Sequence, residues 1–154
     1  MKIVLFFLLL IAYANAQLLN VDILYLEQKI EKPPVLSNVI EEPKNLGLSG
    51  AQLAVIDSNK SSKFLNQNYN LITKISYDEN ELITAFEEFI KNKNSYVILN
   101  VEDELLKKLI ANPLSKDALL INAGSQSTDL RRDYCNKNLI HTIASNAMLY
   151  DGLV

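Results

Sequence analysis

Short apolar runs alternate with amphipathic stretches along most of the chain. The runs are rich in β-branched and aromatic residues and end at polar or turn-forming residues, which is typical of buried strands. This pattern predicts strands over residues 21–26, 70–75, 96–99, 118–121 and 139–144. The polar residues at the ends of these runs mark where each predicted strand ends and a loop or a helix begins.

Helical spacing separates several of these predicted strands. Asp78 is a predicted N-cap, and Glu81 stands three residues later, as in a capping box. Apolar residues then recur with helical periodicity up to the polar break at residues 92–95. A second amphipathic helix is predicted over residues 102–111, ended by Pro113, and a third after Ser145.

Two regions resist this assignment. Residues 46–67 allow a short strand over residues 53–56 or a helix capped by Ser49, and the pattern does not separate them. Residues 31–43 contain three prolines, which exclude regular structure and predict a loop.

The strand runs are apolar on both faces, and they alternate with helices. This combination predicts an α/β fold with a doubly wound, open parallel sheet covered on both sides. Ligands of such sheets bind beyond the carboxyl ends of the strands, where the strand order reverses. We therefore expect a site among the residues that follow the strands, namely Glu27, Ser76, Asn100, residues 122–125 and the region after His141.

The first residues have the plan of a secretory signal peptide. Lys2 gives a positive start, an apolar run covers residues 3–12, and Ala14-Asn15-Ala16 supplies the small residues that a signal peptidase recognises. A membrane span needs about 20 apolar residues, and this run is shorter. We predict a signal peptide over residues 1–16, cleavage near Ala16, a periplasmic location, and no stable membrane insertion afterwards.

Charge and cysteine content narrow the function classes. The chain carries a net charge of −3, and loss of Lys2 would make the remainder more acidic, so no basic footprint for nucleic acid is present. Cys135 is the single cysteine and His141 the single histidine, so neither an internal disulfide nor a zinc site can form from these alone. We predict no metal and no cofactor.

Candidate chemistry is concentrated near the end of the chain. Asn122, Ala123, Gly124 and Ser125 form a turn of small residues after a strand, which could hold a polar ligand or could simply be a tight turn. His141 lies inside an apolar run, which is typical of a buried histidine with a satisfied hydrogen bond. A catalytic His141 would need a nucleophile or carboxylate partner, and no motif supplies one. We therefore predict that the chain is not an enzyme.

The ordered features resemble a known family. A predicted signal peptide, an alternating β/α lobe and the stretch LLINAGSQSTDLRRDYCNKNLIHTIASNAMLYDGL are similar to periplasmic substrate-binding proteins of ABC transporters with the type I fold. The resemblance points to the leucine/branched-chain amino acid receptor group, and within it to a subfamily associated with quinoprotein alcohol dehydrogenase systems. It rests on many modest matches, strongest from Leu119 to Leu153, and includes Gly47, Gly50 and the His141-Thr142 pair.

The resemblance implies more than the pattern shows. It places residues 47–67 in a helix, and it implies that residues 17–154 form the N-terminal lobe, truncated, of a receptor that grips its ligand between two lobes. The implied ligand-binding residues are Asn100, Asn122, Ala123, Gly124, Ser125, His141 and Thr142. Amino-acid receptors of this group often carry Phe-Arg-Thr where this chain has Ile140-His141-Thr142, so a fixed positive charge near the cleft is missing.

Three functional hypotheses follow. The first is a solute-binding component of an ABC transport system, which binds a small polar molecule and delivers it to a membrane permease. The second is a secreted ligand-sensing or accessory protein of a periplasmic quinoprotein dehydrogenase system, without transport. The third is a periplasmic hydrolase that uses His141.

Overall fold

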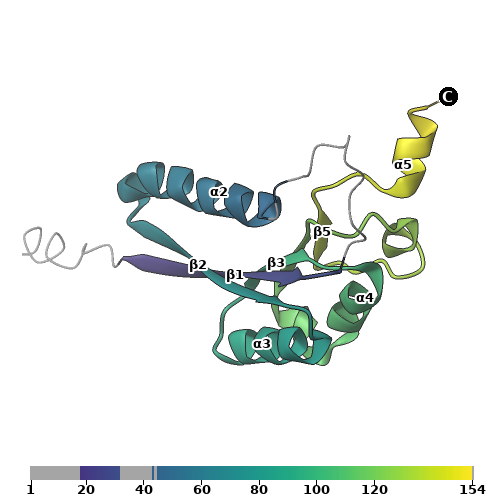
Figure 1. Ribbon diagram of the computed structural model, residues 1–154. Helices are drawn as coiled ribbons and strands as arrows, with labels where there is room; N and C mark the ends of the chain where they lie inside the picture. Colours follow the sequence, from purple (N-terminus) through teal and green to yellow (C-terminus); the bar gives the residue numbers. More distant parts are fainter. Residues whose placement is uncertain (1–17, 32–42, 44, 154) are drawn as a thin grey trace, which may run out of the picture.

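The computed structural model describes residues 18–31, 43 and 45–153. Five strands alternate with helices along the chain, as Figure 1 shows. The elements are β1 (Leu19–Gln28), α2 (Leu46–Ser62), η1 (Lys63–Leu65), β2 (Gln67–Ser76), α3 (Glu79–Lys91), β3 (Tyr96–Asn100), α4 (Asp103–Ala111), η2 (Pro113–Asp117), β4 (Leu119–Asn122), η3 (Thr128–Arg131), β5 (Leu139–His141) and α5 (Asn146–Asp151).

All strand pairs of the sheet are parallel, in the order β2-β1-β3-β4-β5. The chain moves outward from β1 to β2 and then returns past β1 to β3, so the strand order reverses between β1 and β3. A parallel sheet with this order is the doubly wound α/β fold that the sequence predicts. In such folds, ligands bind beyond the carboxyl ends of the strands beside the reversal, which are β1 and β3 in this sheet.

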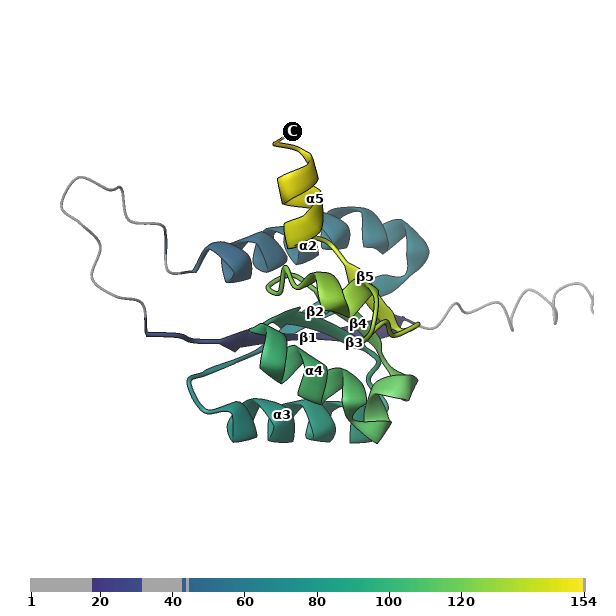
Figure 2. The ribbon, with the colours of Figure 1, turned by 90° about the vertical axis from the view of Figure 1, so that its right-hand side faces the viewer.

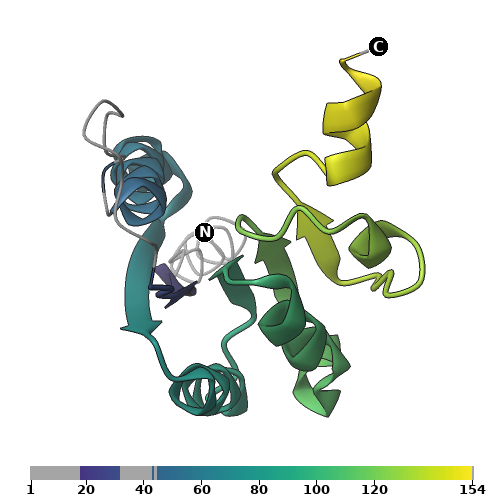
Figure 3. The same cartoon turned by 45° about the vertical axis from the view of Figure 1, so that its right-hand side comes forward.

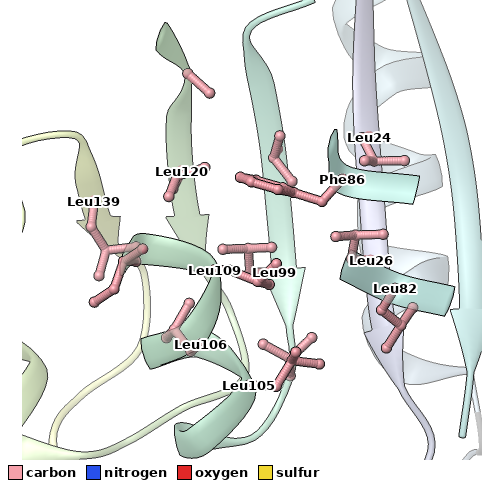
Figure 4. Packing of buried hydrophobic residues seen from close by; sticks show 14 of the residues in the cluster. Leu24, Leu26, Leu82, Phe86, Leu99, Leu105, Leu106, Leu109, Leu120 and Leu139 are labelled. Carbon is pink, nitrogen blue, oxygen red and sulfur yellow. The ribbon is translucent and has the colours of Figure 1, made fainter. Parts of the chain in front are cut away.

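Helices α3 and α4 cover one face of the sheet, and α2 and α5 lie on the other (Figure 2). The core lies under α3 and α4, where leucines from the strands interdigitate with leucines and Phe86 from the two helices (Figure 4). Leu26, Leu82, Phe86, Leu99 and Leu106 are fully buried there. Burial of this apolar surface is the main force that holds the two helices to the sheet.

The opposite face is covered more thinly. Only a narrow stripe of α2 residues packs against the sheet, and the side chains of Leu53 and Ile56 are 59% and 55% exposed. On the strands of this face, Tyr96 and Ile140 remain 43% and 49% exposed. The two faces therefore differ in how completely the helices shield the strands.

The structure confirms the predicted fold class and most of the predicted elements. The open question over residues 46–67 is settled in favour of a helix, which begins at Leu46 and continues to Ser62. Asp78 caps α3 as predicted, because its side chain accepts a hydrogen bond from the Asn80 backbone. Ser145 caps α5 in the same way through Met148 N.

Some local predictions were wrong. Ser49 lies inside α2 and is not its cap. Glu81 does not complete a capping box, because its carboxylate accepts from Lys74 and Ser76, while Ser76 Oγ accepts from the Asp78 backbone. Strand β5 ends at His141, so the predicted strand over residues 139–144 is too long.

The predicted signal peptide over residues 1–16 lies outside the described residues, as does most of the predicted proline-rich loop. Within the described ranges, no helix combines the length and the apolar character needed to cross a membrane.

Candidate functional site

Two groups of polar side chains lie at the carboxyl edge of the sheet. The first, the switch-point cluster, consists of Tyr25, Glu27, Lys29 and Asn100 beneath Gly47 of α2. The second, the turn cluster, joins the ends of β4 and β5 and consists of Asn122, Gly124, Ser125, His141 and Thr142. The sheet order places the first at the reversal between β1 and β3 and the second one strand further along.

A chain of hydrogen bonds runs through the switch-point cluster. Asn100 Nδ2 donates to the Tyr25 hydroxyl at 3.0 Å, and that hydroxyl donates to Glu27 Oε2 at 2.7 Å. Lys29 Nζ forms an ion pair with the other carboxylate oxygen. Glu27 is 6% exposed, so this carboxylate is desolvated and held by its partners.

Strand geometry brings these side chains together. Tyr25 and Glu27 are two residues apart on β1 and therefore point to the same face of the sheet. Register pairs Glu27 with Asn100 on the neighbouring strand β3. Burial raises the pKa of Tyr25 above its ordinary value, and the adjacent Glu27 carboxylate raises it further. The phenol therefore stays protonated and keeps donating to Glu27.

The start of α2 presses directly on this cluster. A Cβ added at Gly47 would lie 2.6 Å from Tyr25 Oη and 2.9 Å from Asn100 Nδ2. A side chain at this position would require Tyr25 and Asn100, or the helix itself, to shift. Glycine at this position thus allows the first turn of α2 to contact the polar rim, and the positive end of a helix dipole then faces the cluster.

On the opposite side of β1, Gln28 connects the rim to α4 and α3. Its Oε1 accepts from the Glu102 backbone at 3.0 Å, and its Nε2 donates to Glu79 at 3.4 Å. Glu79 also pairs with Lys108. These bonds fix the loop after β3 and hold the carboxyl end of β1 in position.

Asn122 organises the turn cluster. It is fully buried, and its Oδ1 accepts from the backbone amides of Gly124 and Ser125 at 3.2 and 2.9 Å. Its Nδ2 donates to the Ser125 carbonyl at 2.7 Å and faces His141 Nδ1 at 3.1 Å. The side chain therefore closes the turn after β4 by itself.

The same bonds determine the state of His141. Because Asn122 Oδ1 already accepts two backbone amides, Nδ2 must face His141, and Nδ1 must accept. Burial lowers the pKa of His141, and the Arg131 charge lowers it further, whereas the Leu130 backbone opposes this lowering. The neutral imidazole thus links the end of β5 to Asn122 at the end of β4.

Close backbone packing completes the turn. A Cβ at Gly124 would lie 2.6 Å from Val101 N and 2.8 Å from Val101 O, so this turn requires glycine. Ser125 is 2% exposed and donates to Asp103 in the first turn of α4. Thr142 Oγ1 donates to the Asn122 carbonyl at 2.9 Å. The polar groups of this cluster are therefore directed at one another.

The predicted ligand-binding residues fall into both clusters. Asn100 belongs to the switch-point cluster, whereas Asn122, Ala123, Gly124, Ser125, His141 and Thr142 lie in or beside the turn cluster. A ligand contact by any of them stays a prediction. Sequence reasoning identified Glu27 at a strand end but missed Tyr25 and Lys29. The two-residue repeat of a strand is the signal that would have added Tyr25.

Other features of the surface are less suited to chemistry. Two shallow hollows lie away from both clusters, one beside Lys74, Asp78 and Glu81 and the other beside Leu18 and Asn59. Within the described ranges, no group of His, Cys, Asp and Glu residues is arranged to hold a metal ion. Comparison of the sequence with models of known protein families and with curated proteins finds no match.

Proposed function

We propose that this chain is the ligand-contacting lobe of an exported solute receptor. It binds a small polar molecule at the switch-point cluster and serves a membrane permease of an ABC transporter. The observation that carries the proposal is a buried, hydrogen-bonded carboxylate, Glu27, at the carboxyl edge where the strand order reverses. The transport role rests on the family resemblance and the predicted signal peptide.

The cluster has the properties of a recognition site for hydrogen-bonding solutes. Small-molecule sites use a few oriented polar groups on a rigid scaffold to fix a ligand. Tyr25 and Asn100 are oriented by strands β1 and β3, and the carboxylate of Glu27 is held between Tyr25 and Lys29. The turn cluster supports the switch-point cluster indirectly. Its Ser125 donates to Asp103 in the first turn of α4, and this bond holds the segment that follows β3.

A ligand screen by thermal unfolding tests the binding role. The purified chain is screened against neutral polyols, amino acids, amines and carboxylic acids, and a ligand raises the midpoint by mass action. For the compound found, calorimetry should give about tenfold or weaker affinity in Glu27→Gln, because an ionised hydrogen-bond partner is lost. Glu102→Gln, an exposed carboxylate at the same edge, is the matched control.

Unchanged affinity in Glu27→Gln would place the ligand elsewhere and contradict the proposed site. The transport role has its own test, which is uptake of the identified compound by cells that carry the gene and by cells from which it is deleted. Equal uptake by the two strains would remove transport and favour a sensing role.

A further inference from the structure

Strand β2 forms a long edge of the sheet. It contains 10 residues and pairs along its whole length with β1, without a bulge in the register. Figure 3 shows this strand at the outer margin of the sheet, with α2 on one face and α3 on the other. Its outer side is therefore a row of backbone groups at the boundary of the described structure.

Alternate residues of β2 direct their backbone groups outward. The carbonyls of Asn66 and Ser76 accept from Leu19 N and Lys29 N of the β1 segment, so residues of even number face β1. Residues of odd number consequently present both N–H and C=O to the outside. These residues are Tyr69, Leu71, Thr73 and Ile75 within the strand, together with Gln67 at its start.

Asn59 of α2 seals one position of this edge. Its Nδ2 donates to the Tyr69 carbonyl at 2.8 Å, and its Oδ1 accepts from Tyr69 N at 2.8 Å. The amide thus imitates a neighbouring strand at Tyr69. For Leu71, Thr73 and Ile75, no such partner is present among the described residues, which leaves three consecutive outward positions open.

Proteins normally protect exposed edges with prolines, bulges or several charges. The open part of β2 has none of these except Lys74, which is engaged by Glu81 on the α3 side. Ile72 and Ile75 are 43% and 38% exposed. We propose that this edge pairs with β2 of a second copy of the chain, in antiparallel orientation, and so joins two sheets into one.

A single register uses every open position on both copies. With Thr73 opposite Thr73 of the second copy, Leu71 lies opposite Ile75, and each pair exchanges two hydrogen bonds. If Ile72 lay opposite Ile72 of the second copy, Ile75 would have to pair with Tyr69, whose backbone groups already bond to Asn59. Pairing centred on Lys74 would oppose two lysines, which is destabilising. In the Thr73 register, Lys74 instead lies opposite Ile72.

The two-fold axis of this pairing also brings the two α2 helices together. The axis of an antiparallel strand pair is perpendicular to the sheet, so both copies of α2 lie on the same face beside the seam. Ile56 precedes Asn59 by three residues and therefore shares its side of the helix, toward the β2 edge. Its side chain is 55% exposed and would become buried across the axis.

Sedimentation equilibrium over a concentration series tests the proposal, with circular dichroism to confirm folding. The unmodified chain should dimerise. Thr73→Pro should weaken the dimer by about 100-fold or more, because proline removes both central donors and suits only an unpaired edge. The Thr73 N–H faces outward, so the monomer fold should remain. Thr73→Val is the matched control and should retain the dimer.

A second variant probes the seam without altering the strand. Ile56→Glu should weaken the dimer by about tenfold or more, through like charges across the axis. The control Phe64→Glu changes a residue that is 91% exposed and distant from the seam, and it should have no effect. A chain that stays monomeric at every concentration, or a dimer unaffected by both Thr73→Pro and Ile56→Glu, would overturn the proposal.

Discussion

The two faces of the sheet are covered by helices in different ways. Beneath α3 and α4, apolar side chains fill the space, and Leu26, Leu99 and Leu106 have no exposed surface. Beneath α2, the most buried side chain is Tyr25, whose hydroxyl joins Glu27 and Asn100. One face gains stability from area removed from water, while the other holds polar groups in fixed orientation.

The face under α3 and α4 should therefore contribute most of the stability, and the face under α2 should tolerate more substitutions. Truncating a buried side chain under α3 and α4 would leave a cavity that close packing cannot easily relax. Truncating a side chain on the outer surface of α2 would only change a surface that already contacts water. We expect substitutions on the two faces to differ strongly in their effects.

Phe86→Ala should be the most destabilising of these changes. Phe86 is fully buried between α3 and the strands, so its truncation should lower the free energy of unfolding by about 3–5 kcal/mol. Leu53→Ala, on the exposed surface of α2, should change it by less than about 0.5 kcal/mol. Urea denaturation of both variants measures the contrast, and equal losses would contradict the difference between the faces.

Asn122→Ala should be next in size. The substitution leaves the amides of Gly124 and Ser125 and the Ser125 carbonyl without their buried partner, and it should lower the free energy of unfolding by about 2–4 kcal/mol. Asn80→Ala, an exposed position on α3, provides the control. If both variants unfold at the same urea concentration, Asn122 does not organise the turn.

His141 should give the turn cluster a pH dependence. Its pKa is lowered below the ordinary value of 6.5, so the unfolded chain binds a proton more readily than the folded chain. This contribution to stability is complete above pH 6.5 and declines as the pH falls through and below that value. Urea denaturation between pH 8 and pH 5 should show a smaller decline for His141→Gln, and an equal decline would exclude His141 as its source.

Tyr25→Phe should destabilise the fold less than Phe86→Ala and Asn122→Ala. The ring still fills its place, while Glu27 keeps Lys29 and Asn100 loses one acceptor, so a loss of about 1 kcal/mol is expected. Tyr150→Phe at an exposed position is the control. A loss as large as that of Phe86→Ala would show that the polar network stabilises the fold as strongly as the apolar core.

The fold was largely predictable because the apolar runs reflect burial directly. Strands β1, β3 and β4 and helices α3 and α4 all contribute to the core, so their apolar positions carry clear periodicity. Helix α2 was ambiguous for the same reason. It buries only a narrow stripe, and exposed Leu46, Leu53 and Ile56 obscure its helical pattern.

The candidate site was predictable only in part. The strand-end rule selected Glu27 and Asn100, since it depends on strand boundaries alone. It could not show that Asn122 bonds to its own turn, or that Gly47 allows α2 to approach Tyr25. The approach of Gly47 to Tyr25 joins segments far apart in the chain, whereas the bonds of Asn122 are local and leave no periodic pattern of apolar residues. The capping box failed for a local reason, because Lys74 and Ser76 at the end of β2 donate to the carboxylate of Glu81.

The central position of β1 has a kinetic consequence. Strand β1 precedes the other strands of the sheet in the chain, but it pairs with β2 and with the still later β3. Asn20 of β1 and Asn68 of β2, for example, are 48 positions apart. Such long loops must close before β1 gains any pairing, whereas β3, α4 and β4 can assemble from nearby residues. We expect the β3–β4 unit to form early and docking of β1 to limit the folding rate. Until β1 docks, the side of β3 that pairs with it therefore remains an unpaired sheet edge.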